Sequence, residues 1–537
     1  MRRTDPRNRR AIAMNRYRDP ELMAPAERWT IAFTVVFGAF MSVMDTSVVN
    51  VSMPHMMGSF GTDLSAITWV ATSYSIAEII MVTMSGWWSA LLGRKNFYLL
   101  SFALFTIGSI LCGTATSFPQ MIVYRIIQGI GGGALIPVSQ AILRETFPPA
   151  QQGMAMALYG MGVVLAPALG PICGGWLTDA WGWPWIFYIN VPVCALGMLL
   201  TMRFVHDPPF LRRGIRSVDW LGIGLLTVCL TGMQVVLERG NDEQWFESPM
   251  IIWWTAATVV SLLILIFWEL RSDEPVVNFR VLKDRNLVLG SVMGLVFGIS
   301  LFGTTFVLPQ FTQKILGYPA FESGLVLAPR ALVLLLFMPL AGWAFQRVGA
   351  KPLLFAGIGV IGLAYYELMQ LSTTAGYLDL IPPLIIMGIG MPFMFVPLST
   401  VSLISVDKSL ITDASSIYTL TRRVGGNIGY SLAAVLLDRG VAIHRVYLTD
   451  HISDLSQTTQ DYLAQSVQIL LAKGMGAAQA LPLALGLLEK KVLRQATMLA
   501  YNDISFAFGC LFFVLVPMVF LMPGRAVIRA LTGGGKK

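Results

Sequence analysis

Three charged residues interrupt long apolar stretches in the first quarter of the chain: Asp45, Glu78 and Arg125. Inside a bilayer such a side chain costs about 2.5–3.5 kcal/mol unless it faces protein or water. A buried carboxylate can also take up and release a proton, and a neighbouring cation changes how readily it does so. Two acids and an arginine in nearby apolar stretches therefore predict a proton relay inside a membrane.

Counting along ideal helices places all three residues in the same half of the membrane. With a rise of about 1.5 Å per residue, Asp45 and Glu78 lie about 13 Å, and Arg125 about 9 Å, from the outer ends of their helices. We therefore expect Asp45 and Arg125 to form a proton-coupling pair. The alternative is a fixed ion pair that only holds helices together. For Glu78 two roles stay open, because it either carries the proton or meets the substrate.

These residues need helices that cross a membrane, and the composition supplies them. Of the 537 residues, 55% are hydrophobic and 13% are charged, whereas soluble proteins carry about 25% charged residues. A spanning helix needs about 20 apolar residues. The sequence therefore predicts an all-α polytopic membrane protein with fourteen transmembrane helices, at 29–54, 69–91, 97–117, 119–143, 153–178, 184–203, 218–237, 250–270, 286–313, 323–346, 352–372, 380–405, 413–437 and 501–522.

Basic residues are distributed unevenly between the two ends of the predicted helices. Connections that contain Lys and Arg alternate with connections poor in them, and segment 1–28 holds eight arginines against four acids. By the positive-inside rule both termini are cytoplasmic, and the basic tail faces anionic lipid headgroups. The long segment 438–500 is then external, and its composition predicts a helical hairpin. No basic patch alternates with exposed aromatics, so we expect no nucleic-acid partner.

The residue patterns that metal or covalent chemistry needs are missing. The five cysteines lie in apolar stretches without a CxxC pair, so we expect neither a disulfide framework nor a metal site. The four histidines lie outside the predicted helix cores, and neither HExxH nor GxSxG occurs. These observations argue against an intramembrane enzyme.

Two short connections share one pattern. The first runs from Gly86-Trp through five residues to Gly93 and Arg94, and the second from Gly342-Trp through five residues to Gly349, followed closely by Lys351. A pattern repeated in two halves implies an internal duplication, which is how secondary transporters are commonly built.

Small residues recur every four positions in the fifth predicted helix, at Gly162, Ala166, Gly170 and Gly174. Such a ladder lets a second helix approach closely. Two interpretations stay open: static packing, or a surface along which helices move between two states.

Several sequence blocks together resemble the major facilitator superfamily, in particular its fourteen-helix drug/proton antiporter branch of the EmrB/QacA type. The resemblance covers about residues 30–522. The matching blocks lie at 44–54, 125–133, 168–176, 183–192, 218–222, 237–240, 245–246, 308–310, 328–330 and 415–426.

The resemblance implies a major facilitator fold with two inserted helices. The implied regions are a basic cytoplasmic tail, an N-terminal six-helix domain, a linker carrying helices seven and eight, a C-terminal six-helix domain that includes the external segment, and a second cytoplasmic tail. They run over 1–28, 29–203, 204–285, 286–522 and 523–537.

The resemblance also implies gating or motif roles for eight residues: Gly86, Gly93, Arg94, Lys95, Gly170, Pro171, Gly174 and Gly175. The chain departs from the family pattern at two places. Ala90 stands near a position usually held by an acid, which puts the cytoplasmic charge lock between the domains in doubt, and Pro184 replaces an arginine.

From these implications we expect proton-coupled efflux of amphipathic drugs or toxic compounds by alternating access, with no cofactor beyond the proton gradient. The candidate substrate-binding residues are Glu78, Gln128, Tyr74, Gln310, Phe306, Phe395 and Tyr418. A dedicated exporter of one physiological product, such as a siderophore, fatty acid or toxin, is the alternative. A nutrient importer is disfavoured by the Gly-Pro motif of the fifth helix. The resemblance further implies the bacterial inner membrane, with a periplasmic adaptor and an outer-membrane channel as further partners.

Overall fold

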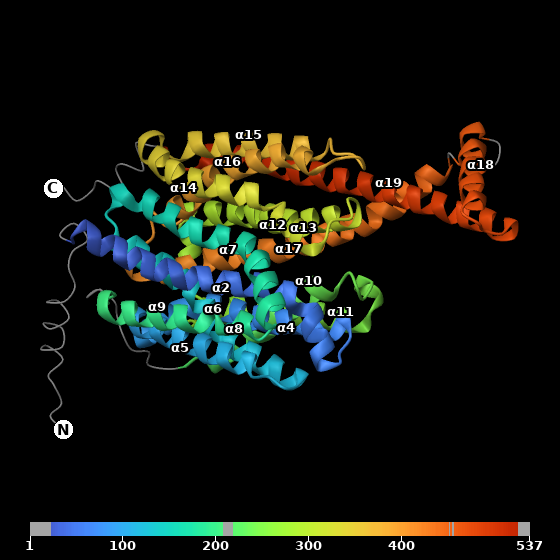
Figure 1. Ribbon diagram of the computed structural model, residues 1–537. Helices are drawn as coiled ribbons and strands as arrows, with labels where there is room; N and C mark the ends of the chain where they lie inside the picture. Colours follow the sequence, from blue (N-terminus) through green and yellow to red (C-terminus); the bar gives the residue numbers. More distant parts are fainter. Residues whose placement is uncertain (1–22, 208–217, 451, 454–455, 525–537) are drawn as a thin grey trace, which may run out of the picture.

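The computed structural model describes residues 23–207, 218–450, 452–453 and 456–524, and these form a bundle of long helices (Figure 1). No strand occurs among the described residues, which confirms the all-α prediction. Residues 1–22 of the basic tail, 208–217 of the linker, 451 and 454–455 of the external segment and most of the second tail, 525–537, lie outside the described residues.

The first half of the bundle begins with α2, which is followed by a single turn and six further helical segments. These elements are α2 (Pro25–Phe60), α3 (Leu64–Ile67), α4 (Trp69–Leu92), α5 (Arg94–Gly113), α6 (Phe118–Thr146), α7 (Gln152–Trp181), α8 (Trp185–Tyr188) and α9 (Asn190–Phe204). Helix α6 lies at the centre, because α2, α4 and α5 all pack against it, while α7 and α9 pack on α2.

The second half repeats this plan after two intervening helices. The intervening helices are α10 (Trp220–Arg239) and α11 (Pro249–Arg271), and the second half comprises α12 (Arg285–Lys314), α13 (Ala320–Leu325), α14 (Ala328–Val348), α15 (Ala350–Leu368), α16 (Tyr377–Val401), α17 (Ile411–Asp450), α18 (Gln457–Ala472), α19 (Ala477–Phe513) and α20 (Val516–Leu521). Helices α12 and α17 pair closely, and α16 packs between α14 and α15. Short 3-10 turns occur at Pro149–Gln151, Trp245–Glu247, Phe279–Lys283 and Lys408–Leu410.

Within the described residues, twelve helices are long and apolar enough to cross a membrane, and α7 adds a thirteenth span that bends by 45°. The bend follows Pro167, a residue that cannot donate the helical hydrogen bond at its position. Helix α17 is the remaining predicted span. It packs along α12, α4, α6 and α19 but is more polar than the other thirteen, because residues such as Arg422 and Arg423 interrupt it. The predicted fourteen-helix architecture thus agrees with the bundle.

The two connections that share the Gly-Trp pattern also share their backbone geometry. Gly93 separates α4 from α5 with φ 82°, and Gly349 separates α14 from α15 with φ 86°. Residues with a side chain rarely adopt this left-handed conformation, so a glycine is favoured at both positions. Equivalent breaks between equivalent helices are what an internal duplication produces.

The inserted pair α10 and α11 packs together at the edge of the bundle. Helix α10 contacts α4 from the first half and α17 from the second, whereas α11 packs mainly on α10. In the most apolar part of α11, only 17% of the residues are buried. The pair therefore covers one side of the seam where the two halves meet.

The segment 438–500 extends the bundle at one end. Helix α17 continues past the predicted end of its span to Asp450, α18 turns across it, and α19 returns from Ala477. These parts project beyond the other helices at the end opposite the described chain ends (right in Figure 1). The predicted hairpin is confirmed as helical, and its two long arms continue directly from the spanning helices.

Glycines control how closely the central helices approach each other. A Cβ added at Gly131 of α6 would overlap the backbone of α5 at Phe105, whereas a Cβ at Gly359 of α15 would meet nothing within 4 Å. The first glycine is needed for packing and the second is not.

We predict that Gly131→Ala lowers the melting temperature of the purified protein, because overpacking costs about 1–3 kcal/mol. The matched control Gly359→Ala should leave the melting temperature unchanged or raise it slightly, since Ala favours a helix over Gly by about 1 kcal/mol. Equal melting temperatures for the two variants would contradict the close packing of α5 and α6.

Candidate functional site

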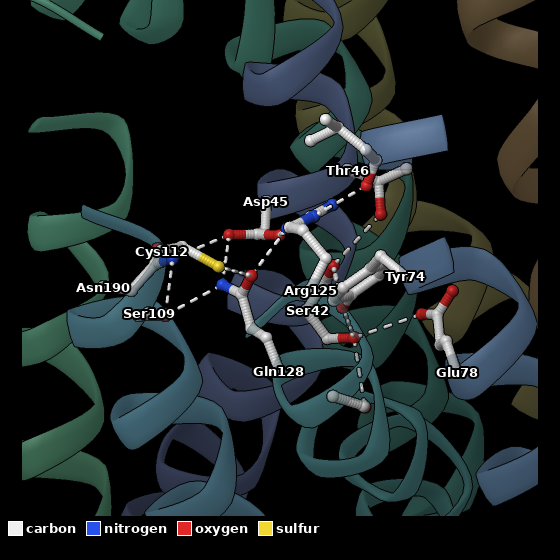
Figure 2. Close-up of polar contacts among 12 residues, drawn as sticks. Ser42, Asp45, Thr46, Tyr74, Glu78, Ser109, Cys112, Arg125, Gln128 and Asn190 are labelled. Carbon is white, nitrogen blue, oxygen red and sulfur yellow. Dashed lines mark hydrogen bonds and ion pairs between the residues drawn. The ribbon is translucent and has the colours of Figure 1, made fainter. Parts of the chain in front are cut away.

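An ion pair joins the first two predicted site residues. The Arg125 guanidinium on α6 donates to the Asp45 carboxylate on α2 over 2.6 Å. Both side chains are buried, with 0% of Arg125 and 2% of Asp45 exposed. Figure 2 shows the pair between helices. The predicted pairing of these two residues is therefore present, and its role in proton coupling stays a prediction.

Three further polar side chains complete the surroundings of Asp45. Its second oxygen accepts hydrogen bonds from the Gln128 amide at 2.8 Å and from the Asn190 amide at 2.7 Å. Both amides also donate to the Ser109 hydroxyl, at 2.8 and 3.2 Å. Helices α2, α5, α6 and α9 thus all contribute to one polar cluster (Figure 2).

This cluster supplies the Asp45 carboxylate with one cationic donor and two amide donors. Hydrogen bonds to an ionised group are shorter and about twice as strong as neutral ones, and Asp45 accepts three of them.

Arg125 makes additional contacts that fix its direction. Its Nε donates to the Val70 carbonyl at 2.9 Å, and its Nη1 donates to the Gln128 side chain at 2.6 Å. The guanidinium carbon also lies 4.2 Å from the centre of the Tyr74 ring. Such stacking is an attractive cation–π contact. Tyr74, on α4, thus connects the ion pair to the next helix.

Glu78 lies in the same region but has a different partner. The Ser42 hydroxyl lies 3.2 Å from Glu78 Oε1 and 3.3 Å from the Tyr74 hydroxyl, so Ser42 bridges these two side chains (Figure 2). The carboxylate of Glu78 forms its ion pair with Arg423 on α17. Because α4 and α17 belong to opposite halves of the bundle, this ion pair crosses the interface between the domains.

A continuous set of contacts therefore runs from the first ion pair to the second. It begins at Asp45 and Arg125, continues through Tyr74 and Ser42, and ends at Glu78 and Arg423. The equal depth predicted for Asp45 and Glu78 is consistent with this connection.

The remaining candidate substrate residues are dispersed. Phe395 and Tyr418 are buried, and Phe306 packs against Tyr430, with ring centres 5.8 Å apart. Gln310 lies on α12. Tyr74 and Gln128 belong to the polar cluster around the ion pair rather than to an apolar surface. Substrate contact for this set stays a prediction.

Gly86 and Arg94 lie near the second half of the bundle. Both are motif residues at the bundle end where the described chain begins. Asp413 of α17 lies directly over Gly86 of α4, where an added Cβ would overlap its carboxylate. Arg94 pairs with Glu145 of its own domain and also donates to the Lys408 carbonyl at 3.4 Å. An acid therefore does meet this motif, although it comes from the other domain and not from the position near Ala90.

The other motif residues have packing roles within the first half. Lys95 donates through its backbone to Asp207 at 2.8 Å and through its side chain to the Met202 carbonyl at 2.6 Å. The small-residue ladder faces α2, because a Cβ at Gly170 would overlap Ser47 and one at Gly174 would lie 2.9 Å from the Val48 carbonyl. Close approach of a second helix is thus confirmed.

The other two residues of that motif, Pro171 and Gly175, have different surroundings. Pro171 would touch a Cβ added at Gly324 of α13, across the domain interface, while a Cβ at Gly175 would meet nothing within 4 Å. The packing of the described residues therefore does not require a glycine at position 175.

Several contributors to the site have no strong sequence signal. Asn190 lies in a matching block and Ser109 in a long apolar stretch, but both are common residue types there. Nothing in the spacing of Arg423 in the sequence identified Glu78 as its partner. Within the described residues, no group of three or more His, Cys, Asp or Glu side chains could hold a metal ion.

Comparison with known proteins agrees with this geometry. Residues 35–430 match the Major Facilitator Superfamily. The chain is 31% identical to the multidrug export protein EmrB of Escherichia coli (strain K12) over 507 residues, covering 94% of this chain and 96% of that protein. It is also 31% identical to the fatty acid resistance protein FarB of Neisseria gonorrhoeae over 503 residues, covering 94% and 97%.

The fold has solved counterparts as well. A structure of the proton:xylose symporter XylE aligns with a TM-score of 0.55 at 15% identity, covering 92% of this chain and 96% of that one. At this identity the likeness concerns the fold alone. Sequence, fold and membrane-spanning helices agree: this multi-pass membrane protein is a transporter rather than an enzyme, and it belongs to the major facilitator superfamily, in its EmrB-type branch.

Proposed function

We propose that this protein exports amphipathic compounds in exchange for protons, and that Asp45 carries the proton. The observation that supports this most is the buried ion pair of Asp45 and Arg125, because it is linked through Tyr74 and Ser42 to an ion pair between the domains. A proton on the first carboxylate can thereby influence the contact that holds the two halves together.

Protonation removes the charge that holds Arg125 in place. The guanidinium then lacks its counter-ion in a buried site, where an unpaired charge is strongly unfavourable. Arg125 must either move toward another acceptor or gain water. Because it stacks on Tyr74, such a movement displaces the ring whose hydroxyl contacts Ser42 beside Glu78.

In alternating access, the contacts across the domain interface break at one end while the halves stay together at the other. At the end where the described chain begins, Asp413 covers Gly86 and Arg94 reaches the Lys408 carbonyl. Two residues further along α17, Ser415 donates to the Pro137 carbonyl of α6 at 3.1 Å. Separating the halves at one end requires these contacts to break, and the ion pair of Glu78 and Arg423 lies between both ends.

The transported class and the setting also belong to this proposal. Relatives named for multidrug export and for fatty acid resistance support amphipathic substrates. A dedicated exporter of one physiological product is the second candidate. We place the protein in a bacterial inner membrane with both termini cytoplasmic. The projection formed by α17, α18 and α19 would then contact a periplasmic adaptor, which leads to an outer-membrane channel.

We predict that Asp45→Asn abolishes accumulation driven by a pH gradient in proteoliposomes but retains substrate counterflow, that is, exchange of labelled for unlabelled substrate. Counterflow needs the moving domains but no net proton transfer. The amide of Asn has nearly the shape of the carboxyl group and, like the protonated acid, carries no charge.

Two results would contradict the role of Asp45. Accumulation at the wild-type rate would show that the proton is carried elsewhere. Loss of both activities, with the purified variant still folded, would favour the alternative in which the ion pair only holds the helices together.

For the ion pair between the domains we predict strong coupling between Glu78→Gln and Arg423→Gln. Each single variant leaves one buried charge without its partner, which is destabilising, whereas the double variant leaves none. The free energies of unfolding should therefore differ from additivity by about 0.5–3 kcal/mol in favour of the double variant. Additive effects would show that the two side chains do not stabilise each other.

A further prediction concerns the projection formed by α17, α18 and α19. Replacing residues of α18, Gln457–Ala472, with a flexible Gly-Ser linker of equal length should leave gradient-driven transport in proteoliposomes intact. The same variant should lower drug resistance of whole cells, because only there must the substrate pass to an adaptor. Full resistance of cells at normal expression would argue against an adaptor at this surface.

A further inference from the structure

Some buried arginines of the described helices have no acidic partner. Four of the buried or half-buried arginines are Arg125, Arg330, Arg422 and Arg423, and two of the buried acids are Asp45 and Glu78. The acids are paired with Arg125 and Arg423. Within the described part of the chain, no carboxylate forms an ion pair with Arg330 or Arg422.

The two remaining arginines differ in position. Arg330 lies inside the C-terminal half, where it donates to Thr305 at 3.2 Å and approaches the Met387 sulfur at 3.9 Å. Arg422 lies on α17 at the interface between the halves and is 5% exposed. Only Arg422 would be uncovered by separation of the domains.

Aromatic rings from both domains enclose Arg422. Its guanidinium carbon lies 5.4 Å from the centre of the Phe395 ring on α16. Phe395 in turn stacks on Tyr159 of α7, with ring centres 6.2 Å apart and planes inclined by 27°. Tyr159 also interacts electrostatically with Arg422. One wall of the enclosure thus belongs to the N-terminal domain and the other to the C-terminal domain.

These surroundings match the chemistry of an amphipathic anion. A guanidinium binds carboxylate, sulfonate or phosphate groups through paired hydrogen bonds, and aromatic rings provide an apolar surface for the rest of such a molecule. A cationic headgroup would instead meet a positive charge that no acid neutralises. The neighbouring Arg423 is already neutralised by Glu78.

We propose that Arg422 binds the headgroup of amphipathic anions in a substrate site that opens between Tyr159 and Phe395 as the domains separate. The inference rests on the proposed export function and specifies its substrate class. Arg422 is therefore a specificity-determining residue, distinct from the ion pair that carries the proton.

The test compares two permanently charged fluorescent compounds in inside-out proteoliposomes with an imposed pH gradient. The anion is 8-anilinonaphthalene-1-sulfonate and the cation is ethidium. We expect the wild type to transport the anion, and we expect Arg422→Gln to lower the ratio of anion to ethidium transport by about tenfold or more, the factor that corresponds to a lost charge-assisted hydrogen bond.

Two variants serve as controls. Arg422→Lys keeps the charge and should retain a substantial part of the preference for the anion, although it loses the planar donor geometry. Arg330→Gln removes another buried arginine without an acidic partner, away from the interface, and should leave the anion-to-ethidium ratio unchanged. An equal fall in both transport rates for Arg422→Gln, or no fall, would overturn the inference.

A measurement on the wild type keeps the inference testable if Arg422→Gln does not fold. Laurate should inhibit transport of the anion, whereas its uncharged methyl ester should not; equal inhibition by both would overturn the inference. Transport of ethidium without transport of the anion would overturn this inference but not the proposed export function. Transport of neither compound, under any gradient, would instead count against the proposed export function.

Discussion

The ion pair of Asp45 and Arg125 is the constraint on which the first half of the bundle depends. Two charges can remain buried only if they neutralise each other and their other polar atoms are hydrogen-bonded. This requirement brings α2 against α6 and recruits Gln128 and Asn190 from neighbouring positions. Gly132 of α6 leaves room for the neighbouring helices, because an added Cβ would overlap the Tyr74 hydroxyl of α4 and lie 3.2 Å from the Ser42 hydroxyl of α2.

The second half supplies a complementary set of charges on one helix. Helix α17 carries Arg422 and Arg423 toward the first half, and Asp413 at its beginning covers Gly86. Its polar composition is therefore a consequence of its place at the domain interface. The same composition explains why its apolarity falls below that of the other spanning helices. Stability and movement are linked here, because the contacts that hold the halves together are also those that separation must break.

Much of this arrangement could be predicted from the sequence. The contacts that could not be predicted share a physical cause. Helix positions, the small-residue ladder and the pairing of Asp45 with Arg125 follow from local periodicity and from the cost of buried charge. The partner of Glu78 could not be predicted, since Arg423 lies 345 positions away. Which side chains meet across an interface depends on the rotation and register of whole helices, and local spacing does not encode these. For the same reason Asp413 was not expected to cover Gly86.

In the proposed exchange, Asp45 binds a proton that substrate binding releases. The most direct measurement follows the pH of a weakly buffered solution of purified transporter when a transported compound is added. Wild-type protein should release protons on addition of the compound, and Asp45→Asn, which still binds the compound, should release none. Equal proton release by the wild type and the variant would contradict the account, because the exchanged proton would then belong to another group.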